Sequence, residues 1–241
     1  TYLIEKKILF SNDAFGQHYA SELMYNDKVD NDELYDEALK YYANILTPFS
    51  KFVVGKIEEV VALNIPIEMI CPSHGIIWRD NPLQIVNKYM DWAKNYQENQ
   101  IAIVYDTMWN GTRRMAEAIA EGIKSKDKDV DIKLFNCAKR DKNDIITEVF
   151  KSKMILVGSS TINSGILTAT AGILEMIKGM KFTNKKAAAF GSYGWSGEAV
   201  KIITEQLKEA KFEVVNDGIR ELWNPDEEAL ERCREFGRNL V

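Results

Sequence analysis

The protein has 241 residues, a formal net charge of −5 at pH 7 and a hydrophobic content of 46%. This length allows one large domain or two ordinary ones, with enough apolar residues for a sizeable core. The negative charge and the absence of a basic cluster argue against a nucleic-acid partner. The longest apolar runs have the length of strands, so no membrane span is expected. The three cysteines lie far apart without a CxxC pair, which predicts a reducing compartment, the cytoplasm.

The first part of the chain mixes short apolar runs with two helical patterns. Apolar runs predict a hairpin or two strands at 1–4 and 7–10, and a further strand at 65–71. Helical periodicity is found at 36–49, 52–63 and 83–96, and the polar stretch 28–37 is expected to be exposed. A polar stretch at 96–100 follows, which predicts two domains, 1–98 and 99–241.

Two residues of this first part stand in loops just after strands, where functional groups are often held. Asp13 follows the strand at 7–10, and the alternative is that it caps the next turn. His74 follows the strand at 65–71 between Pro72 and Gly75, which suits a metal ligand. The alternative for His74 is a hydrogen-bonded structural residue.

The second part alternates strands and helices regularly. The expected pairs of strand and helix are 101–105 with 113–124, 131–135 with 141–150, 154–158 with 170–180, 186–191 with 198–210, and 213–218 with 226–240. This order predicts an α/β fold with a five-stranded doubly wound parallel sheet. Such sheets bind ligands at the carboxyl ends of their strands.

The loop between the first strand and the first helix of this part has the composition of an anion site. Unpaired N–H groups and the positive end of the helix dipole lie at a helix N-terminus, and Thr107, Asn110 and Thr112 add polar side chains. The loop lacks the Gly-Lys-Ser/Thr ending of a P-loop and the GxGxxG of dinucleotide sites, which favours a terminal monophosphate. The alternative is an ordinary turn with Thr112 as the helix cap.

Two further loops, 159–164 and 192–197, are expected at the same edge of the sheet. Together the three loops favour flavin mononucleotide, with its phosphate in the first loop and its flat ring held by the other two. The alternative is that the aromatic residues only pack. The residues expected to bind FMN are Thr107, Met108, Trp109, Asn110, Gly111, Thr112, Ser159, Ser160, Thr161, Ile162, Asn163, Ser192, Tyr193, Gly194, Trp195, Ser196 and Gly197.

The segments YDTMWNGT, GSSTINSGIL and FGSYGWSGEA resemble the flavodoxin-like domain of flavodiiron proteins. The segments KILFSNDAFGQH and EMICPSHGIIWR resemble the metallo-β-lactamase-like αββα domain of the same family. The resemblance covers nearly the whole chain. It implies an oxidoreductase that reduces dioxygen to water, nitric oxide to nitrous oxide, or both. Electrons would pass from rubredoxin or a similar donor through FMN to a non-haem diiron site.

The same resemblance assigns roles to residues of the first part. Asp13 matches the carboxylate that bridges the two irons, and His74 matches a histidine ligand of one iron. Tyr41 or Tyr42 matches a tyrosine near the diiron pocket, while His18 is expected to be structural. The family's HxExDH motif and a further histidine are absent, so most iron ligands are expected in a missing N-terminal portion. The family also implies a head-to-tail homodimer or a dimer of dimers.

A second function from another class follows from the shortage of iron ligands. The chain could be a flavodoxin-type electron carrier whose metal-free N-terminal region only binds partners. A hydrolase of the metallo-β-lactamase type is disfavoured, because its zinc-ligand cluster is absent as well.

Overall fold

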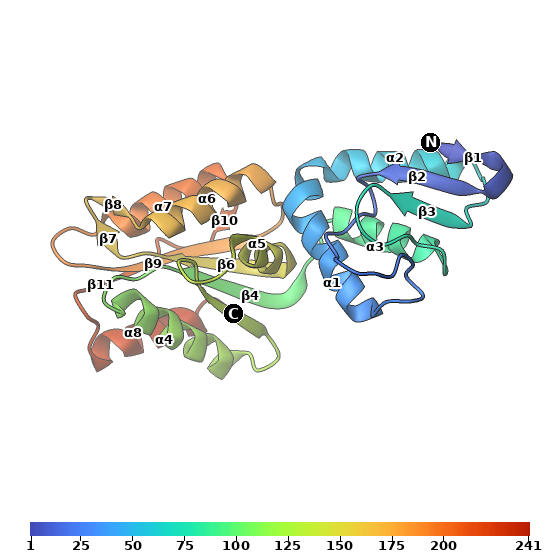
Figure 1. The fold of residues 1–241 in the computed structure, drawn as a ribbon. Helices are drawn as coiled ribbons and strands as arrows, with labels where there is room; N and C mark the ends of the chain where they lie inside the picture. Colours follow the sequence, from blue (N-terminus) through green and yellow to red (C-terminus); the bar gives the residue numbers. More distant parts are fainter. The chain divides into compact units, whose positions relative to one another are not determined.

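The chain forms two compact units in this computed structural model, which describes all 241 residues (Figure 1). The first unit is Thr1–Tyr96 and the second is Gln97–Val241. None of the helices combines the length and the apolar character needed to cross a membrane.

A three-stranded sheet is the centre of the first unit. Its strands are β1 (Tyr2–Leu3), β2 (Ile8–Asn12) and β3 (Met69–Pro72). β1 and β2 form an antiparallel hairpin, and β2 pairs in parallel with β3. The third strand is shorter than the apolar run at 65–71, because Pro66 has no N–H to donate to a ladder. The helices of this unit are α1 (Asn31–Tyr41), α2 (Ser50–Ala62) and α3 (Leu83–Ala93).

The expected helix 36–49 differs from α1 at both ends. α1 begins within the stretch expected to be exposed, because the Asp30 side chain accepts a hydrogen bond from the Glu33 N–H at 3.0 Å and Leu34 is fully buried. The α-helix ends at Tyr41, and a π turn and a 3-10 turn follow it. Pro48 lies in this segment, where its ring excludes a regular helix.

The sheet of the second unit is parallel, and its strand order is β10-β9-β6-β4-β5 with β11 also paired to β9. The strands are β4 (Glu98–Tyr105), β5 (Asp131–Asn136), β6 (Ser152–Gly158), β9 (Lys186–Tyr193), β10 (Glu213–Val214) and β11 (Ile219–Leu222). This confirms the predicted α/β class with a doubly wound parallel sheet.

The last strand differs from the continuous strand expected at 213–218. It is divided into β10 and β11, because the chain turns at 215–218. Gly218 adopts φ +80°, and a Cβ there would lie 2.5 Å from the Ala189 carbonyl oxygen. A small hairpin of β7 (Thr161–Ile162) and β8 (Gly165–Ile166) was also not expected. Its turn residues, Asn163 and Ser164, both have positive φ, as a tight two-residue hairpin requires.

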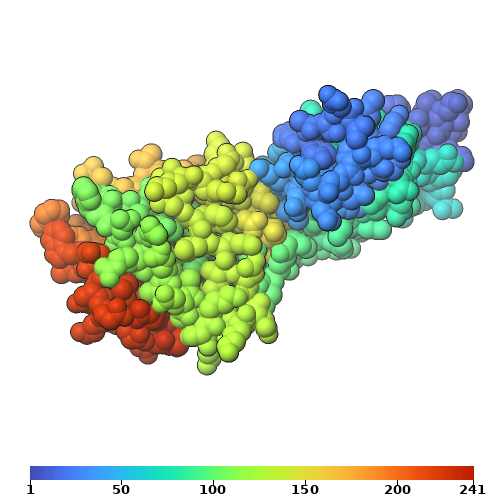
Figure 2. Space-filling model, turned by 60° about the horizontal axis from the view of Figure 1, so that its bottom comes forward, coloured from blue at the N-terminus to red at the C-terminus, as the bar shows by residue number.

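The helices of the second unit cover both faces of its sheet (Figure 1). α4 (Gly111–Lys126) and α8 (Glu227–Arg238) lie on one face. On the other face lie α5 (Lys142–Lys151), α6 (Thr168–Met180) and α7 (Glu198–Glu209). Figure 2 shows the last residues of the chain, in red, directly against the green residues of α4.

The contact between α4 and α8 depends on two glycines. A Cβ at Gly122 would lie 2.0 Å from the Arg234 carbonyl oxygen, and a Cβ at Gly237 would lie 2.2 Å from the Ile119 carbonyl oxygen. The two helix backbones therefore touch directly. Because α4 begins at one of the loops expected to bind a ligand, this close packing also fixes that loop.

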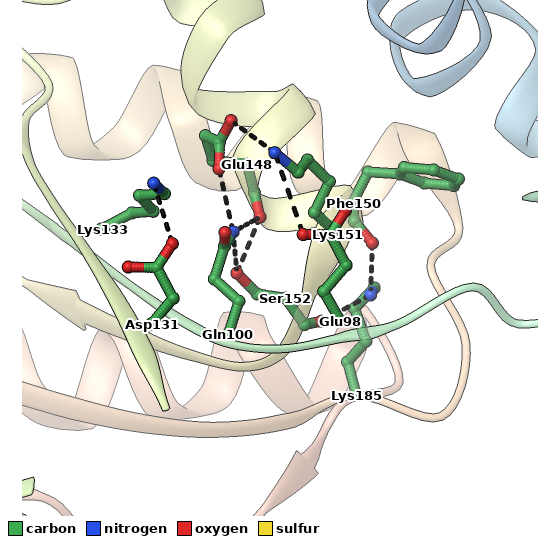
Figure 3. A network of polar contacts seen from close by, with 9 residues as sticks. All are labelled: Glu98, Gln100, Asp131, Lys133, Glu148, Phe150, Lys151, Ser152 and Lys185. Atoms are coloured by element: carbon green, nitrogen blue, oxygen red, sulfur yellow. Dashed lines mark hydrogen bonds and ion pairs between the residues drawn. The ribbon is translucent and has the colours of Figure 1, made fainter. Parts of the chain in front are cut away.

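A buried lysine, Lys185, lies at the amino end of β9 (Figure 3). Lys185 Nζ donates to the Phe150 carbonyl oxygen at 2.7 Å and to the Ser152 carbonyl oxygen at 2.6 Å. No carboxylate pairs with it, and burial lowers the pKa of Lys185 to about 7. Gln100 ties the same region together by donating to Ser152 Oγ at 3.0 Å.

We predict that Gly122→Ala destabilises the second unit by about 2–3 kcal/mol, because the new methyl group overpacks a backbone contact. Urea titration of the parent and the variant measures this difference. Gly172→Ala is the matched control, since nothing lies within 4 Å of a Cβ in its exposed helix position. A variant at Gly122 as stable as the control would contradict the packing.

We also predict a pH-dependent contribution from Lys185. An unfolded lysine has a pKa near 10.5, so the unfolded chain binds more protons than the folded chain between about pH 7 and 10.5. The parent should therefore gain about 3 kcal/mol relative to Lys185→Met between pH 7 and pH 10. Urea titrations at the two pH values measure the change, with exposed Lys186→Met as control. A difference that is constant with pH would contradict the prediction.

Candidate functional site

The three loops expected to bind a ligand meet at the carboxyl edge of the second unit's sheet. They surround a cavity of about 710 Å³, here called the main pocket. Twelve of the predicted residues line it: Met108, Trp109, Gly111, Ser160, Thr161, Ile162, Asn163, Ser192, Tyr193, Gly194, Trp195 and Ser196. Ser164, Trp223 and Asn224 complete the lining.

Five predicted residues do not line the main pocket: Thr107, Asn110, Thr112, Ser159 and Gly197. Ser159 is fully buried, and its hydroxyl is used within the loop. It donates to the Ser160 carbonyl oxygen at 2.8 Å and accepts from the Leu167 N–H at 2.9 Å. Ser159 therefore shapes the second loop rather than offering its side chain to a ligand.

A cluster of three hydroxyls joins the loops beneath the main pocket. Thr112 Oγ1 lies 3.0 Å from Ser160 Oγ and 2.9 Å from Ser192 Oγ, and the two serine oxygens lie 3.3 Å apart. All three residues are buried. Each comes from a different loop, so the cluster fixes the loops relative to one another. The alternative prediction, that Thr112 caps the helix, is wrong, because α4 begins at Gly111 and Thr112 lies within it.

The N-terminus of α4 has no side-chain cap. Asn110 adopts φ 65° and makes no capping bond, and the first backbone bond runs from the Arg114 N–H to the Asn110 carbonyl oxygen. The N–H groups of Gly111 and Thr112 therefore have no partner in the helix. In the same loop the buried Thr107 hydroxyl also has no hydrogen-bond partner. Free donors of this kind suit a phosphate group.

Exposed aromatic rings form the rim of the main pocket. Trp195 is 92% exposed and Trp109 is 84% exposed. Trp223 packs edge-on against Trp195, with the ring centroids 5.1 Å apart. These rings offer flat apolar surface to a planar ligand.

Trp223 was missed in the sequence because the last strand was placed too early. β11 pairs with β9 so that Leu222 is opposite Tyr193, and this pairing brings Trp223 to the edge of the pocket. The Trp223 N–H donates to the Tyr193 carbonyl oxygen at 2.6 Å. A Cβ on Gly194 would lie 2.7 Å from the Trp223 ring, so the glycine lets this ring pack closely against the third loop.

No charged residue lines the main pocket. Two arginines contact residues that line the main pocket. Arg114 donates to Asn224 Oδ1 at 3.0 Å, and the Arg220 guanidinium lies 5.6 Å from the centre of the Tyr193 ring. A ligand ring in this pocket would therefore be held by apolar surface and neutral hydrogen-bonding groups.

In the first unit the predicted metal ligands lie together. Asp13 follows β2 and His74 follows the parallel neighbour β3, so the two loops lie side by side. Asp13 Oδ1 lies 3.3 Å from His74 Nε2, and both side chains are about half exposed or more. Neither residue is used as a helix cap.

A buried glutamine holds these two loops together. Gln17 Nε2 donates to the Ile76 carbonyl oxygen at 3.0 Å, and Gln17 Oε1 accepts from the Ile76 N–H at 2.6 Å. Gly75 adopts φ +81°, and a Cβ there would lie 1.7 Å from Gln17 Oε1. Only glycine fits between the histidine and this brace.

Aromatic rings surround the Asp13–His74 pair. The Tyr41 ring lies 5.0 Å from the His18 ring and 6.2 Å from the His74 ring. Burial, with a smaller effect of the Asp13 charge, raises the pKa of Tyr41, so its hydroxyl stays protonated. Tyr42 points elsewhere: it is fully buried and lies 2.8 Å from Ser50 Oγ through its hydroxyl. Of the two tyrosines, only Tyr41 lies near the predicted metal ligands.

Asp13 and His74 alone do not make a metal centre. The chain contains no group of three or more His, Cys, Asp or Glu side chains that could hold a metal ion. His18 lies 6.0 Å from the His74 ring, centre to centre, and packs as a ring rather than completing a ligand set. The three cysteines are free thiols, and burial raises the pKa of Cys137 to about 11.

Comparison with known proteins agrees with this architecture. The flavodoxin family model matches residues 103–237. An anaerobic nitric oxide reductase flavorubredoxin of Klebsiella pneumoniae is 54% identical over 241 residues, which are 100% of this chain and 50% of that protein. The chain therefore spans about half the length of the curated relatives it matches.

Two solved structures are similar over both units. The rubredoxin oxygen:oxidoreductase of Desulfovibrio gigas gives a TM-score of 0.94 at 33% identity, over 98% of this chain and 59% of that chain. The flavodiiron protein of Giardia intestinalis gives a TM-score of 0.93 at 32% identity, over 99% of this chain and 59% of that chain. The resemblance to flavodiiron proteins inferred from the sequence is thus confirmed, and through its second unit the chain belongs to the flavodoxin family.

Proposed function

We propose that the second unit binds FMN, with the flavin ring in the main pocket and the phosphate at the first loop, 107–112, which borders that pocket. The observation that carries the proposal is the buried Thr107 hydroxyl, which has no partner and belongs to the loop that leads into the uncapped N-terminus of α4. A buried polar atom without a partner costs free energy unless a ligand satisfies it. The FMN phosphate would accept from Thr107 and from the free N–H groups of Gly111 and Thr112.

The other loops of the pocket would hold the flavin ring. Trp195 and Trp223 offer apolar faces, and the hairpin at 161–166 offers backbone groups at the ring's edge. FMN, when bound, supplies electron transfer in one- and two-electron steps. The protein's part is to bind and orient the ring and to leave it in a neutral environment, since no charged side chain lines the pocket.

For the first unit, we propose that it is part of a metallo-β-lactamase-like domain in which Asp13 and His74 are metal ligands. Their parallel strands and their separation of 3.3 Å support this role. Tyr41 would lie beside the metal centre as a proton-bearing group. Because the chain holds no third ligand, its own residues do not fit a complete diiron site, and no reaction step is assigned to them.

For the whole protein, we propose a flavodiiron oxidoreductase that reduces nitric oxide, dioxygen or both. The match over the full chain to a protein named a nitric oxide reductase, and to another named a rubredoxin oxygen:oxidoreductase, supports both substrates. The second name also supports rubredoxin or a similar protein as the donor. We further propose a cytoplasmic protein that assembles as a head-to-tail homodimer or a dimer of dimers, as the resemblance implies.

A second candidate function is a flavodoxin-type electron carrier without a metal. The lack of any group of three metal-binding side chains in this chain favours it. In that case the first unit would serve only to bind partner proteins. Both candidates need FMN in the second unit, and they differ in whether iron is present.

We predict that Thr107→Val weakens FMN binding about tenfold or more, because a hydrogen bond to the charged phosphate is lost. Riboflavin, which has no phosphate, should bind the parent and the variant equally. Fluorescence titration measures both affinities. Thr204→Val is the matched control, because it removes another buried hydroxyl without a partner, on α7. Equal loss for FMN and riboflavin would contradict the phosphate assignment.

We predict that the complete protein contains iron and consumes nitric oxide or dioxygen when supplied with reduced rubredoxin and FMN. Asp13→Asn should lower the iron content, because it removes a ligand charge. The two readouts are elemental analysis for iron and gas-electrode measurements, in which nitric oxide or dioxygen is added to an assay that is otherwise anaerobic. Asp27→Asn, at an ion pair with Arg79 in the same unit, is the control. Iron-free preparations that contain FMN and transfer electrons between proteins would instead support the carrier.

A further inference from the structure

A second cavity of the second unit lies away from the three loops of the main pocket. It has a volume of about 680 Å³ and is here called the amino-end pocket. Gln97, Lys153, Lys186 and Glu213 line it, and each stands within the first two residues of a strand of the sheet or directly before one. The amino-end pocket is therefore at the edge of the sheet opposite the main pocket, with which it shares no residue.

Four lysines line the amino-end pocket without forming an ion pair: Lys153, Lys185, Lys186 and Lys211. Lys153 Nζ donates to Asn99 Oδ1 at 2.6 Å, and this amide oxygen is a neutral acceptor. Lys186 and Lys211 are exposed, and their side chains make no hydrogen bond within the protein. The ammonium groups around this cavity therefore have no protein anion paired with them.

Lys185 is the buried member of this group, with 4% of its surface exposed. Its Nζ donates to the carbonyl oxygens of Phe150 and Ser152, as Figure 3 shows. The centres of the Phe150 and Phe182 rings lie 6.0 and 5.8 Å from this Nζ. A protonated lysine has three N–H donors, so one donor of Lys185 is not used by the protein. Burial lowers the pKa of Lys185 to about 7, and no paired anion offsets this effect.

The acidic side chains of the neighbouring elements pair with another lysine. Glu98 of β4 and Glu148 of α5 lie 4.0 and 3.3 Å from Lys151 Nζ. Neither is within ion-pair distance of Lys185 Nζ.

Three carboxyl groups line the amino-end pocket itself, those of Asp127, Glu213 and Val241. Asp127 Oδ1 accepts from two backbone N–H groups of the turn that follows it, at 3.0 and 3.2 Å. None of the three lies within ion-pair distance of the four lysines. Because four lysines face three carboxylates, the cavity has a surplus of positive charge only when Lys185 is protonated.

We propose that the amino-end pocket binds a small oxyanion and that Lys185 takes up a proton when the anion binds. The exposed ammonium groups of Lys186 and Lys211 attract the anion, and the unused N–H of Lys185 donates to it. The anion in turn offsets the cost of charging a buried amine, so anion and proton bind together. The oxyanion is either a free inorganic ion or a phosphate group of a larger molecule, for which the cavity leaves room. This site does not depend on the proposed flavin site.

The test uses the full chain loaded with FMN, so that the first loop is filled. Sulfate is the probe, because it keeps its charge at every pH used. Calorimetric titration at constant ionic strength, in two buffers of different ionisation enthalpy, counts the protons taken up per sulfate. We expect about one proton at pH 8.5 and about none at pH 6, since Lys185 is neutral in the first case and charged in the second. The affinity should fall about tenfold between pH 8 and pH 9, because the bound anion raises the pKa of Lys185.

Two variants locate the site. Lys185→Met should bind sulfate without proton uptake and with an affinity that does not change with pH. Lys211→Gln keeps the proton uptake and should weaken sulfate about fivefold, because one charge near the anion is lost. Lys208→Gln is the matched control, because it removes an exposed charge three residues earlier, on α7 and outside the cavity. Circular dichroism checks that each variant is folded, and the Lys211 and Lys208 pair tests the site even if Lys185→Met does not fold.

A second arm identifies the source of the oxyanion by comparing inorganic phosphate with phenyl phosphate at pH 8.5. Tighter binding of phenyl phosphate supports a phosphate group of a larger molecule, and equal binding supports a free ion. Failure of the flavin site is separately visible, because FMN would then not bind while the Lys211 and Lys208 variants still differed in sulfate affinity. The proposal is overturned if the parent binds no sulfate, if binding takes up no proton at pH 8.5, or if Lys211→Gln and Lys208→Gln weaken binding equally.

Discussion

The second unit depends on the parallel register of its three central strands. β4 pairs with β6 so that Tyr105 is opposite Gly158, and β6 pairs with β9 so that Gly158 is opposite Phe190. The three strands therefore reach the carboxyl edge within a few residues of one another, and their loops begin at the same level. Gly158 is required here, because a Cβ would lie 2.3 Å from the Phe190 ring. The register thus brings the three loops together before any loop side chain contributes.

The hydroxyl cluster then fixes the three loops relative to one another, and so defines the main pocket between them. Thr112, Ser160 and Ser192 come from the three loops and satisfy one another while buried. Burying three hydroxyls without partners would be costly, so the loops are stable only in this mutual arrangement. Thr107, by contrast, is left without a partner in the same loop. The paired hydroxyls therefore have a structural role, whereas the unpaired Thr107 hydroxyl is available to a ligand. The composition of the loop does not distinguish these two roles.

The sequence predicted most of this fold because its strands are long and apolar and its helices are amphipathic. The predictions were wrong where pairing at a distance decides the structure. β11 has four residues, and only its pairing with β9 makes it a strand, so Trp223 was missed at the pocket. Likewise, periodicity did not separate Tyr41 from Tyr42, because both side chains are buried and the α-helix ends between them. The contact of Tyr41 with the His74 ring could be seen only once the two loops were placed.

Both units hold their functional loops in place with buried polar side chains, but the side chains differ in kind. In each, parallel strands bring functional loops to one edge, and a buried polar group braces the loops from beneath. In the first unit the brace is Gln17, whose amide bonds both ways to Ile76. In the second unit the braces are short hydroxyls, which leave room for a larger cavity above them. A rigid brace below an open, partly exposed pair such as Asp13 and His74 holds ligands in place while keeping them accessible. The positions of the functional groups in both units are therefore set by buried polar residues that hold neighbouring loops together.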